Sequence, residues 1–328
     1  MRAIVLESYG GPEVLQVRDV PDPVPGPEEV VVEIASAGVN RADLLQVRGF
    51  YSGPPMAHEI PGLELAGHVV ATGERAAVWS IGDAVMGIVG GGAYAERIAV
   101  HERQLVPVPP SIPIEDAGAV PEVYITAWDA FVQGGLTAGR VALVHAGASG
   151  VGTAAIQLAK AMGAVVVVTA SAPKLDTCRG LGADAAVDYR SEDFVSVVQA
   201  LGGADVILDV VGGDYLARNV DALRTGGTIV QVGVMGGGDA TFPLAALLPK
   251  RASIVGTTLR GRPIEAKIAV TQRFGREVLP WLADGTCVPI IDTRYPLAEV
   301  ADAHRRIEAN DTIGKLVLDV PGPTARAF

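Results

Sequence analysis

The chain has 328 residues, of which 49% are hydrophobic and 19% charged, and its formal net charge is −11 at pH 7. This length favours about two domains, and the composition is that of a folded protein. The acidic balance, without a block rich in lysine and arginine, argues against a broad nucleic-acid-binding face. Since no apolar run reaches about 18 residues and the start lacks the apolar core of a signal peptide, we expect no membrane span and no secretion.

The two cysteines, Cys178 and Cys287, do not form a C-x-x-C pattern. Such sparse cysteine usage suits a reducing, cytoplasmic compartment and excludes a structural zinc lobe built from several cysteines. We therefore expect both thiols to be small packing residues.

The first 120 residues contain short β-prone runs separated by glycine and proline, which predicts a small barrel-like domain. The runs lie at 3–6, 14–17, 30–34, 68–71, 84–88 and 94–100. A brief helical turn is expected at 40–47. A single helix is expected over 114–132, bridging the two domains.

The stretch 141–164 reads as a strand, a small-residue loop and a helix. In that context a glycine cluster predicts phosphate binding, because glycines allow close approach and the helix N-terminus offers free N–H groups. Ser149 replaces the usual middle glycine of the G-x-G-x-x-G pattern and adds a hydroxyl donor. The residues expected to bind the cofactor phosphates are Gly147, Ser149, Gly150, Val151 and Gly152.

Beyond this loop, apolar runs alternate with helical stretches, which predicts an α/β domain with a parallel sheet covered on both faces. The strands are expected at 165–169, 186–188, 206–210, 228–232 and 253–257, and the helices at 151–163, 173–181, 191–201 and 213–224. The alternation stops near 258. A helix at 265–282, a strand at 288–294, a helix at 298–309 and a last strand at 315–319 then indicate a return to the first domain.

The expected organisation is therefore a catalytic β domain over 1–122, a nucleotide-binding domain over 123–258 and a return segment over 259–328. A ligand cleft is expected where the two domains meet, because ligand sites often lie at domain junctions.

NADPH is the expected cofactor. An NAD site usually places a carboxylate after the second strand to bind the ribose, and none occurs from 164 to 175. Ser171 and Lys174 lie there instead and suit a phosphate, although Lys174 has an alternative reading as a solvated lysine. Tyr189 is expected at the same end. Gly233, Met235 and Gly236, after the strand at 228–232, are expected near the nicotinamide.

Three motifs resemble the medium-chain dehydrogenase/reductase superfamily, and within it the zinc-independent quinone oxidoreductase (zeta-crystallin-like) branch. They are AGVNRAD at 37–43, PGLELAGHV at 61–69 and HAGASGVG at 145–152. The resemblance covers residues 1 to about 320. It implies an α/β fold, with a GroES-like β-barrel domain and an inserted Rossmann domain with a doubly wound parallel sheet.

No metal ion is expected. Zinc members of the superfamily carry a cysteine and a Gly-His-Glu motif where this chain has Asn40 and Gly62-Leu63-Glu64. A catalytic zinc needs about three protein ligands, and Asn40 and Leu63 remove two. A quinone or conjugated enone is already electrophilic and does not need a Lewis acid, unlike an alcohol.

The sequence thus predicts an NADPH-dependent, metal-independent quinone reductase, with Asn40, Tyr51 and Thr126 as catalytic donors. By resemblance, Tyr51 and Ser149 fall on positions tied to cofactor binding and activity, and Lys315 is expected to contact the cofactor. Three plainer readings stay open: Tyr51 as a groove-filling aromatic, Asn40 as a helix cap and Lys315 as an ordinary strand start.

Two alternative functions also stay open: an enoyl or enone reductase acting on C=C bonds, and an NADPH-binding regulatory or structural protein with little turnover. The expected partner is a small-molecule quinone or enone. A homodimer or homotetramer is expected, because superfamily members often pair through the edge of the nucleotide-binding sheet, and 253–259 is the candidate edge.

Overall fold

The computed structural model describes residues 1–320 and 322. The chain forms two compact units. Unit 1 comprises Met1–Ile125 and the chain from Leu259 onward, and unit 2 comprises Thr126–Thr258. The described residues contain no helix that is long and apolar enough to cross a membrane.

Unit 1 is built on β-sheet. A seven-stranded sheet has the order β14-β15-β3-β4-β5-β7 with β6 also pairing with β3, and β1 and β2 form a separate pair. The strands of unit 1 are β1 (Arg2–Val5), β2 (Gln16–Asp19), β3 (Glu29–Val39), β4 (Glu64–Thr72), β5 (Ala84–Ile88), β6 (Arg97–His101), β7 (Leu105–Pro107), β14 (Ile291–Pro296) and β15 (Lys315–Asp319). The pairing of β15 with β3 brings Leu316 opposite Val39.

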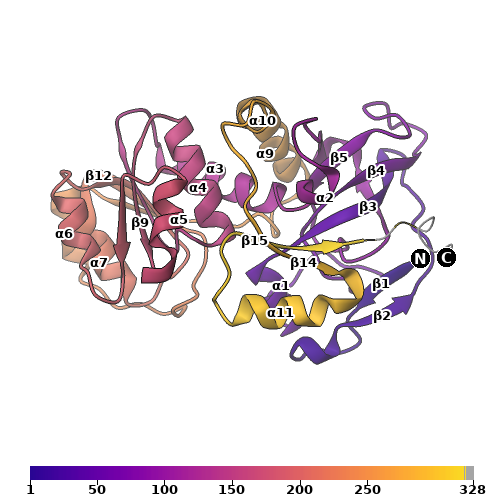
Figure 1. Cartoon of the computed structure of the whole chain (residues 1–328), viewed down its shortest axis with the longest axis horizontal. Helices are drawn as coiled ribbons and strands as arrows, with labels where there is room; N and C mark the ends of the chain where they lie inside the picture. Colours follow the sequence, from indigo (N-terminus) through magenta and orange to yellow (C-terminus); the bar gives the residue numbers. More distant parts are fainter. Residues whose placement is uncertain (321, 323–328) are drawn as a thin grey trace. The chain divides into compact units, whose positions relative to one another are not determined.

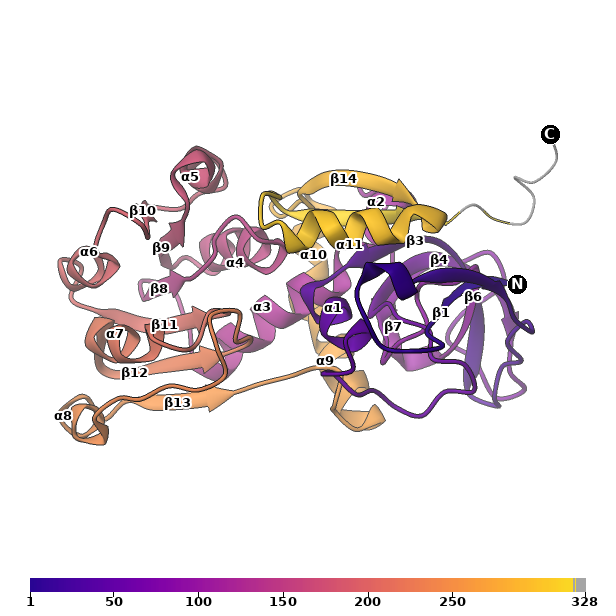
Figure 2. The same ribbon diagram turned by 90° about the horizontal axis from the view of Figure 1, so that it is seen from below.

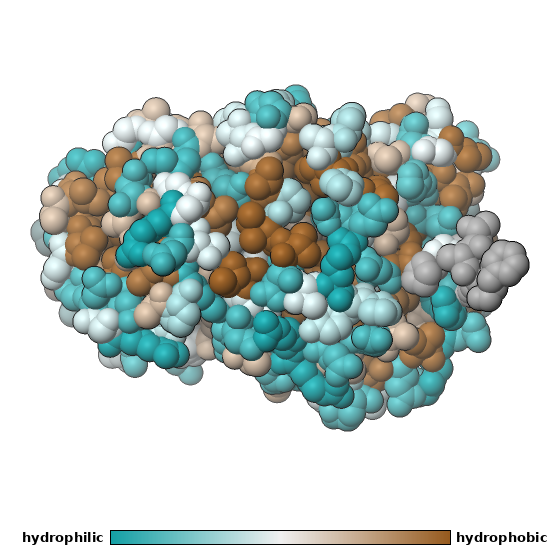
Figure 3. Space-filling view, in the orientation of Figure 1, coloured by the Kyte–Doolittle hydropathy of each residue, from teal (hydrophilic) through white to brown (hydrophobic). Residues whose placement is uncertain are grey.

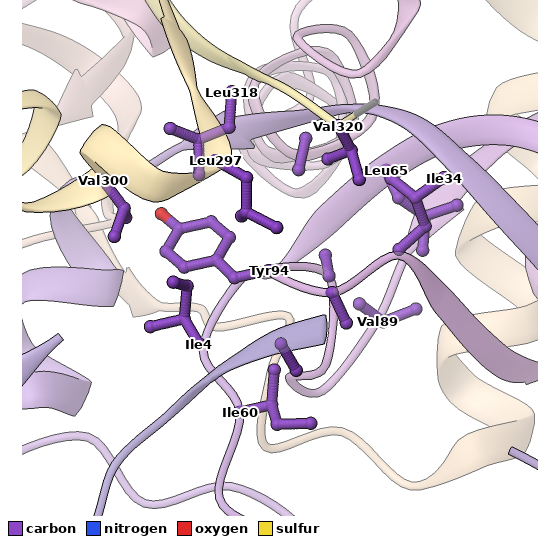
Figure 4. Packing of buried hydrophobic residues seen from close by; sticks show 14 of the residues in the cluster. Ile4, Ile34, Ile60, Leu65, Val89, Tyr94, Leu297, Val300, Leu318 and Val320 are labelled. Carbon is purple, nitrogen blue, oxygen red and sulfur yellow. The ribbon is translucent and has the colours of Figure 1, made fainter. Parts of the chain in front are cut away.

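The core of unit 1 joins the two ends of the chain. Figure 4 shows the Tyr94 ring beside Ile4, from β1, and beside Leu297 and Val300. Leu318 on β15 belongs to the same buried cluster. Burial of each such side chain contributes about 1.5–3 kcal/mol, so the C-terminal segment stabilises the N-terminal strands.

The helices of unit 1 are α1 (Arg41–Val47), α2 (Ile114–Ala117), α9 (Ile264–Glu277), α10 (Leu279–Ala283) and α11 (Val300–Glu308). Helix α11 lies beside β14 and β15 (Figure 1). It buries Val300 and Ala303, while its outer side is hydrophilic (Figure 3). This amphipathic pattern is typical of a helix covering a sheet.

Two helices predicted as single are each divided. The stretch 114–132 forms α2 and α3 (Pro121–Gly134), because the chain leaves the helix at Gly118 and Pro121 starts a new one. The stretch 265–282 forms α9 and α10, with Pro280 in the first turn of α10. A proline lacks the N–H that would continue the preceding helix.

Unit 2 is a six-stranded parallel sheet in the order β10-β9-β8-β11-β12-β13. The strands are β8 (Val141–Val144), β9 (Val165–Ala170), β10 (Ala185–Asp188), β11 (Ala204–Asp209), β12 (Leu223–Gln231) and β13 (Ser253–Gly256). The helices are α4 (Gly150–Ala161), α5 (Leu175–Gly180), α6 (Phe194–Gln199), α7 (Tyr215–Ala222) and α8 (Leu247–Lys250). Figure 2 shows α4 on one face and α6 and α7 on the other. The predicted doubly wound α/β fold is confirmed.

Candidate functional site

The glycine loop follows β8 and opens helix α4. A Cβ atom on Gly152 would lie 2.3 Å from the carbonyl oxygen of Ala146, and one on Gly147 would lie 2.8 Å from the Cβ of Val168. A side chain at either position would therefore clash with its neighbours, so only glycine fits there. The loop leaves the first N–H groups of a 12-residue helix without helical partners, an arrangement that suits the phosphates of a dinucleotide.

Ser149 is the N-cap of α4. Its Oγ accepts a hydrogen bond from the N–H of Gly152 at 3.1 Å. A hydroxyl that accepts a bond still has its own hydrogen to donate, so capping the helix and donating to a phosphate are compatible. Gly150 and Val151 form the first turn behind it. The loop thus has the geometry that a cofactor phosphate requires.

A buried polar chain supports the strand ends beside this loop. His145 Nε2 lies 2.7 Å from Asn219 Oδ1, and Asn219 Nδ2 donates to Asp209 Oδ2 at 2.9 Å. Asp209 Oδ1 accepts from the N–H groups of Val211 and Gly212. Burial lowers the pKa of His145, so the ring is neutral. These hydrogen bonds give Asp209 a structural role, because they connect β8, β11 and α7.

The residues expected at the adenosine end follow β9 and β10. Ser171 and Lys174 are partly exposed, and Ser171 makes no side-chain capping bond to the short helix that follows (Ala172–Lys174). Tyr189 is 41% exposed, and the guanidinium of Arg190 lies 5.6 Å from its ring centroid. Arg190 adds a cation that the sequence analysis missed, because nothing in its spacing marked it.

The loop after β12 is tied by its backbone to the end of β11. The N–H of Met235 donates to the carbonyl of Val210 at 3.1 Å, and the N–H of Gly236 donates to that of Val211 at 2.7 Å. The Met235 side chain is exposed and Gly233 is partly exposed. The expected cofactor loop thus lies at the carboxyl edge of the sheet, where open parallel sheets bind ligands.

Unit 1 holds a buried polar cluster around Asn40, the N-cap of α1. Its backbone N–H donates to Asp43 Oδ2 at 2.7 Å. Its Nδ2 donates to Glu64 Oε1 at 2.9 Å, and its Oδ1 accepts from Lys315 Nζ at 2.7 Å. The second amide hydrogen faces the carbonyl of Gly38 at 3.4 Å. The carboxamide is thus held in one orientation by buried partners.

Lys315 is turned into this cluster. Its Nζ donates to the carbonyl of Val39, to Asn40 Oδ1 and to Glu64 Oε1, at 2.7 to 2.9 Å. The three ammonium hydrogens therefore all have acceptors. The pairing of β15 with β3 fixes this placement. The geometry favours a role inside the cluster over the expected contact with the cofactor.

This cluster does not fit a zinc ion. Leu63 is buried, the carboxamide of Asn40 is already engaged, and the ammonium of Lys315 occupies Glu64 Oε1. A divalent cation would meet a positive charge there and lack nitrogen or sulfur ligands. Within residues 1–320 and 322, no group of three or more His, Cys, Asp or Glu side chains is placed to hold a metal.

Three carboxyl groups meet beside Lys315. Asp43 accepts from the Tyr94 hydroxyl at 2.8 Å, and burial raises the pKa of Asp43 to about 6. Glu64 Oε2 accepts from the backbone N–H of Glu122 at 2.8 Å. Burial, followed by the charges of Glu64 and Asp43, raises the pKa of Glu122 to about 8. In the sequence, Glu122 is marked only by its place in the first turn of a helix.

Tyr51 lies beside a nearly buried arginine. The guanidinium of Arg260 is 5.0 Å from the Tyr51 ring centroid and donates to the carbonyls of Tyr51 and Gly90. Lys267 is also nearly buried, and its Nζ lies next to Gly90. A Cβ atom added to Gly90 would be 3.3 Å from that nitrogen. Burial lowers the pKa of both cations. Neither cation was expected from the sequence.

Thr126, the third expected donor, is buried on α3 and begins unit 2. It lies one helical turn after Glu122. The structure thus brings Asn40 into the buried cluster and places Tyr51 beside Arg260, both in unit 1.

Comparisons with known proteins agree with this architecture. Residues 26–110 match the alcohol dehydrogenase GroES-like domain, and residues 150–274 match the zinc-binding dehydrogenase family. The chain is 32% identical to the synaptic vesicle membrane protein VAT-1 homolog of Rattus norvegicus, over 98% of this chain and 85% of the relative. It is 31% identical to the quinone oxidoreductase of Lama guanicoe, over 97% of each.

Among solved structures, the Escherichia coli quinone oxidoreductase complexed with NADPH matches with a TM-score of 0.88. The identity is 27%, and the match covers 97% of this chain and 100% of the other. The likeness therefore extends over both units of the fold.

Proposed function

Given that the chain belongs to the zinc-independent quinone oxidoreductase branch of the medium-chain dehydrogenase/reductase superfamily, we propose that it is an NADPH-dependent, metal-independent quinone reductase. The family makes it an oxidoreductase with a nicotinamide cofactor. When bound, that cofactor supplies a hydride. The quinone substrate and the preference for NADPH are our proposals.

One observation carries the proposal: the positive charge in the cluster around Asn40 is the ammonium group of Lys315, a residue of the protein itself. The ammonium of Lys315 is bonded to Glu64 and to Asn40, which stands at one of the expected ligand positions of a zinc enzyme, and Leu63 stands at the other. A substrate reduced there must accept a hydride without a Lewis acid, and a quinone does so because its reduced anion is delocalised. Tyr51 and Thr126 are the proposed substrate-side donors, whereas Asn40, the third expected donor, has its amide hydrogens engaged with Glu64 and Gly38 and holds the cluster together.

The proposed cofactor contacts follow the strands of unit 2. The glycine loop holds the pyrophosphate, and Ser171, Lys174 and Tyr189 bind the adenosine end. Gly233, Met235 and Gly236 line the nicotinamide end. Charge-assisted hydrogen bonds contribute about 1.5–3 kcal/mol each, so one such bond to the ribose phosphate favours NADPH by about tenfold or more.

The direct test is a titration of the purified protein with NADPH and NADH against a panel of quinones. We expect NADPH consumption with simple quinones. A preference for NADH would overturn the cofactor assignment, and turnover of alcohols alone would overturn the substrate assignment.

A second candidate function is reduction of the C=C bond of an enone. It needs a proton for the second carbon, and a carboxyl group that keeps its proton near neutral pH, as Glu122 does, favours it. Product analysis with alkenals and enoyl thioesters separates the two functions, because a saturated carbonyl product arises only from C=C reduction.

We propose a homodimer, with a homotetramer as the alternative, formed through β13. This strand ends the sheet of unit 2 (Figure 2), and Ile254 on it is exposed. Leu244 and Leu248, just before it, are 71% and 76% exposed. An apolar edge strand is a site for pairing with another chain. Light scattering should give at least twice the chain mass, and Ile254→Lys should reduce it; a monomeric wild type would contradict the proposal.

We also propose a cytoplasmic location. Cys178 and Cys287 are both free and buried, which suits a reducing compartment. Fractionation of cells that express the chain tests this placement.

A further inference from the structure

We propose that Asp209 is a positioning residue for the nicotinamide half of the cofactor, and that His145 and Asn219 act through it. The inference rests on the proposed function for the identity of the ligand. Every group that it uses belongs to unit 2. Asp209 ends β11, His145 directly follows β8 and Asn219 lies on α7, and all three side chains are completely buried.

The hydrogen bonds of these side chains run in one direction. Asn219 Nδ2 donates to Asp209 Oδ2 at 2.9 Å, so Asn219 Oδ1 faces His145 Nε2, at 2.7 Å, and accepts its hydrogen. A neutral imidazole carries one N–H group, which leaves His145 Nδ1 to accept from the Thr169 hydroxyl at 3.0 Å. The arrangement therefore selects the tautomer of His145 that carries its proton on Nε2.

The imidazole ring of His145 is held between two aromatic rings. Phe194 and Tyr215 pack edge-on against it, each with its ring centroid 4.9 Å from that of the imidazole. A rotated imidazole would lose its hydrogen bonds at both nitrogens. The ring therefore keeps the carboxamide of Asn219 in one orientation.

The second oxygen of Asp209 holds the turn that follows β11. Asp209 Oδ1 accepts from the N–H of Val211 at 2.6 Å and from that of Gly212 at 3.1 Å. Gly212 and Gly213 have φ angles of 67° and 53°, in the left-handed region that glycine adopts without strain. Two successive glycines give the turn little stiffness of its own, because glycine has the largest backbone freedom. The carboxylate of Asp209 therefore fixes where this turn lies.

The loop after β12 is attached to the same turn. The N–H of Gly236 donates to the carbonyl of Val211 at 2.7 Å. A Cβ atom on Gly213 would lie 2.8 Å from the carbonyl oxygen of Gly236, so the two backbones are in close contact. Gly236 and its neighbour Met235 are among the residues proposed to line the nicotinamide end. A displaced turn would therefore displace the nicotinamide end.

The proposed adenosine contacts do not depend on this turn. Ser171, Lys174 and Tyr189 follow β9 and β10, which lie on one side of β8 in the sheet, whereas β11 and β12 lie on the other. Loss of the Asp209 carboxylate should therefore weaken binding of the nicotinamide half and leave that of the adenosine half unchanged.

The first experiment reads the direction of the hydrogen bonds without a ligand. Nitrogen NMR of the histidine rings should show the His145 proton on Nε2, and His145→Gln identifies the signals. Asp209→Asn presents an amide donor to Asn219, which should turn the Asn219 carboxamide over and move the His145 proton to Nδ1. A proton on Nδ1 in wild type, or one that stays on Nε2 in Asp209→Asn, overturns the link through Asn219.

The second experiment compares a whole and a half ligand by calorimetry. The two ligands are NADPH and adenosine 2′,5′-bisphosphate, which lacks the nicotinamide half. Asp209→Leu should weaken NADPH by about tenfold relative to the bisphosphate, because binding must then order the free turn. Asp209→Asn keeps an oxygen that accepts both N–H groups and should retain the wild-type ratio of Kd values. Asn219→Leu removes the anchor of Asp209 Oδ2 and should shift the ratio in the same direction, which provides a second test if Asp209→Leu does not fold.

Asp205→Leu is the matched control. Asp205 is a buried carboxylate on the same strand, where it accepts from the N–H of Val141 at 2.9 Å and pairs with Arg224 at 3.1 Å. Its loss should lower the free energy of unfolding and leave the ratio of Kd values unchanged. A ratio that Asp209→Leu and Asn219→Leu do not change, or that Asp205→Leu changes equally, overturns the proposal. If wild type binds neither ligand, the proposed function fails instead.

Discussion

Lys315 Nζ lies 2.7 Å from Glu64 Oε1, and the two side chains are 4% and 0% exposed. The pair joins β15 to β4, and each partner has further hydrogen bonds, to Asn40 and to the backbone. Desolvation makes a buried pair of this kind weak evidence for net stability, but removing one partner leaves an uncompensated charge. We therefore expect the cluster to tolerate the loss of both charges better than the loss of one.

Lys315→Met should destabilise the protein by about 3–5 kcal/mol, because it leaves the Glu64 carboxylate buried without its cation. Urea unfolding measures this loss. The double variant Lys315→Met/Glu64→Leu removes both charges and should recover much of the stability. A single variant as stable as wild type would show that Glu64 finds another partner or takes up a proton.

The stability of the fold should depend on the ionisation of Glu122. Its pKa rises from 4.5 to about 8 on folding, so the folded state holds the proton more tightly than the unfolded chain. The resulting stabilisation is fully present below pH 4.5 and is lost as pH rises through about 8. The free energy of unfolding of wild type should fall across this window relative to that of Glu122→Gln. A constant difference between the two proteins would contradict the raised pKa.

Ser149 should contribute separately to the helix and to the cofactor. Ser149→Ala removes the cap and should cost about 0.5–2 kcal/mol of stability together with NADPH affinity. Ser149→Asp keeps a capping oxygen but adds a negative charge at the phosphate position. It should therefore retain stability and still lose NADPH binding, as fluorescence titration measures. A normal NADPH affinity in Ser149→Asp would show that no cofactor phosphate binds at this loop.

Lys174 should favour NADPH over NADH. Lys174→Ala is expected to lower that preference by about tenfold, the loss of one charge-assisted hydrogen bond. Arg179→Ala is the matched control, because Arg179 lies on the adjoining helix α5 and pairs with Asp176 at 2.7 Å. Equal effects of the two substitutions on the ratio of Kd values would mean that only general charge matters.

Local patterns in the sequence predicted more of the fold than of the site. The glycine loop and the alternating strands of unit 2 were predictable, because each depends on neighbours within one βα unit. The divided helices were missed because Pro121 and Pro280 were read as interior residues. Pro121 is the first residue of α3, and Pro280 is the second residue of α10.

The buried cluster depended on contacts distant in sequence. Lys315 and Asn40 are 275 positions apart and meet only because β15 pairs with β3. Glu122, Arg260 and Lys267 gave no periodic signal, since their importance comes from burial beside other charges. Asn40 was predicted as a site residue, but its partners were not.

The initial rate of NADPH oxidation with benzoquinone, before and after removal of bound metal by a chelator, tests the central claim most directly. We predict rapid turnover whose rate does not change, because a quinone accepts a hydride without a Lewis acid and Lys315 already occupies the buried cluster. A rate that disappears with the metal and returns when zinc is added would contradict it.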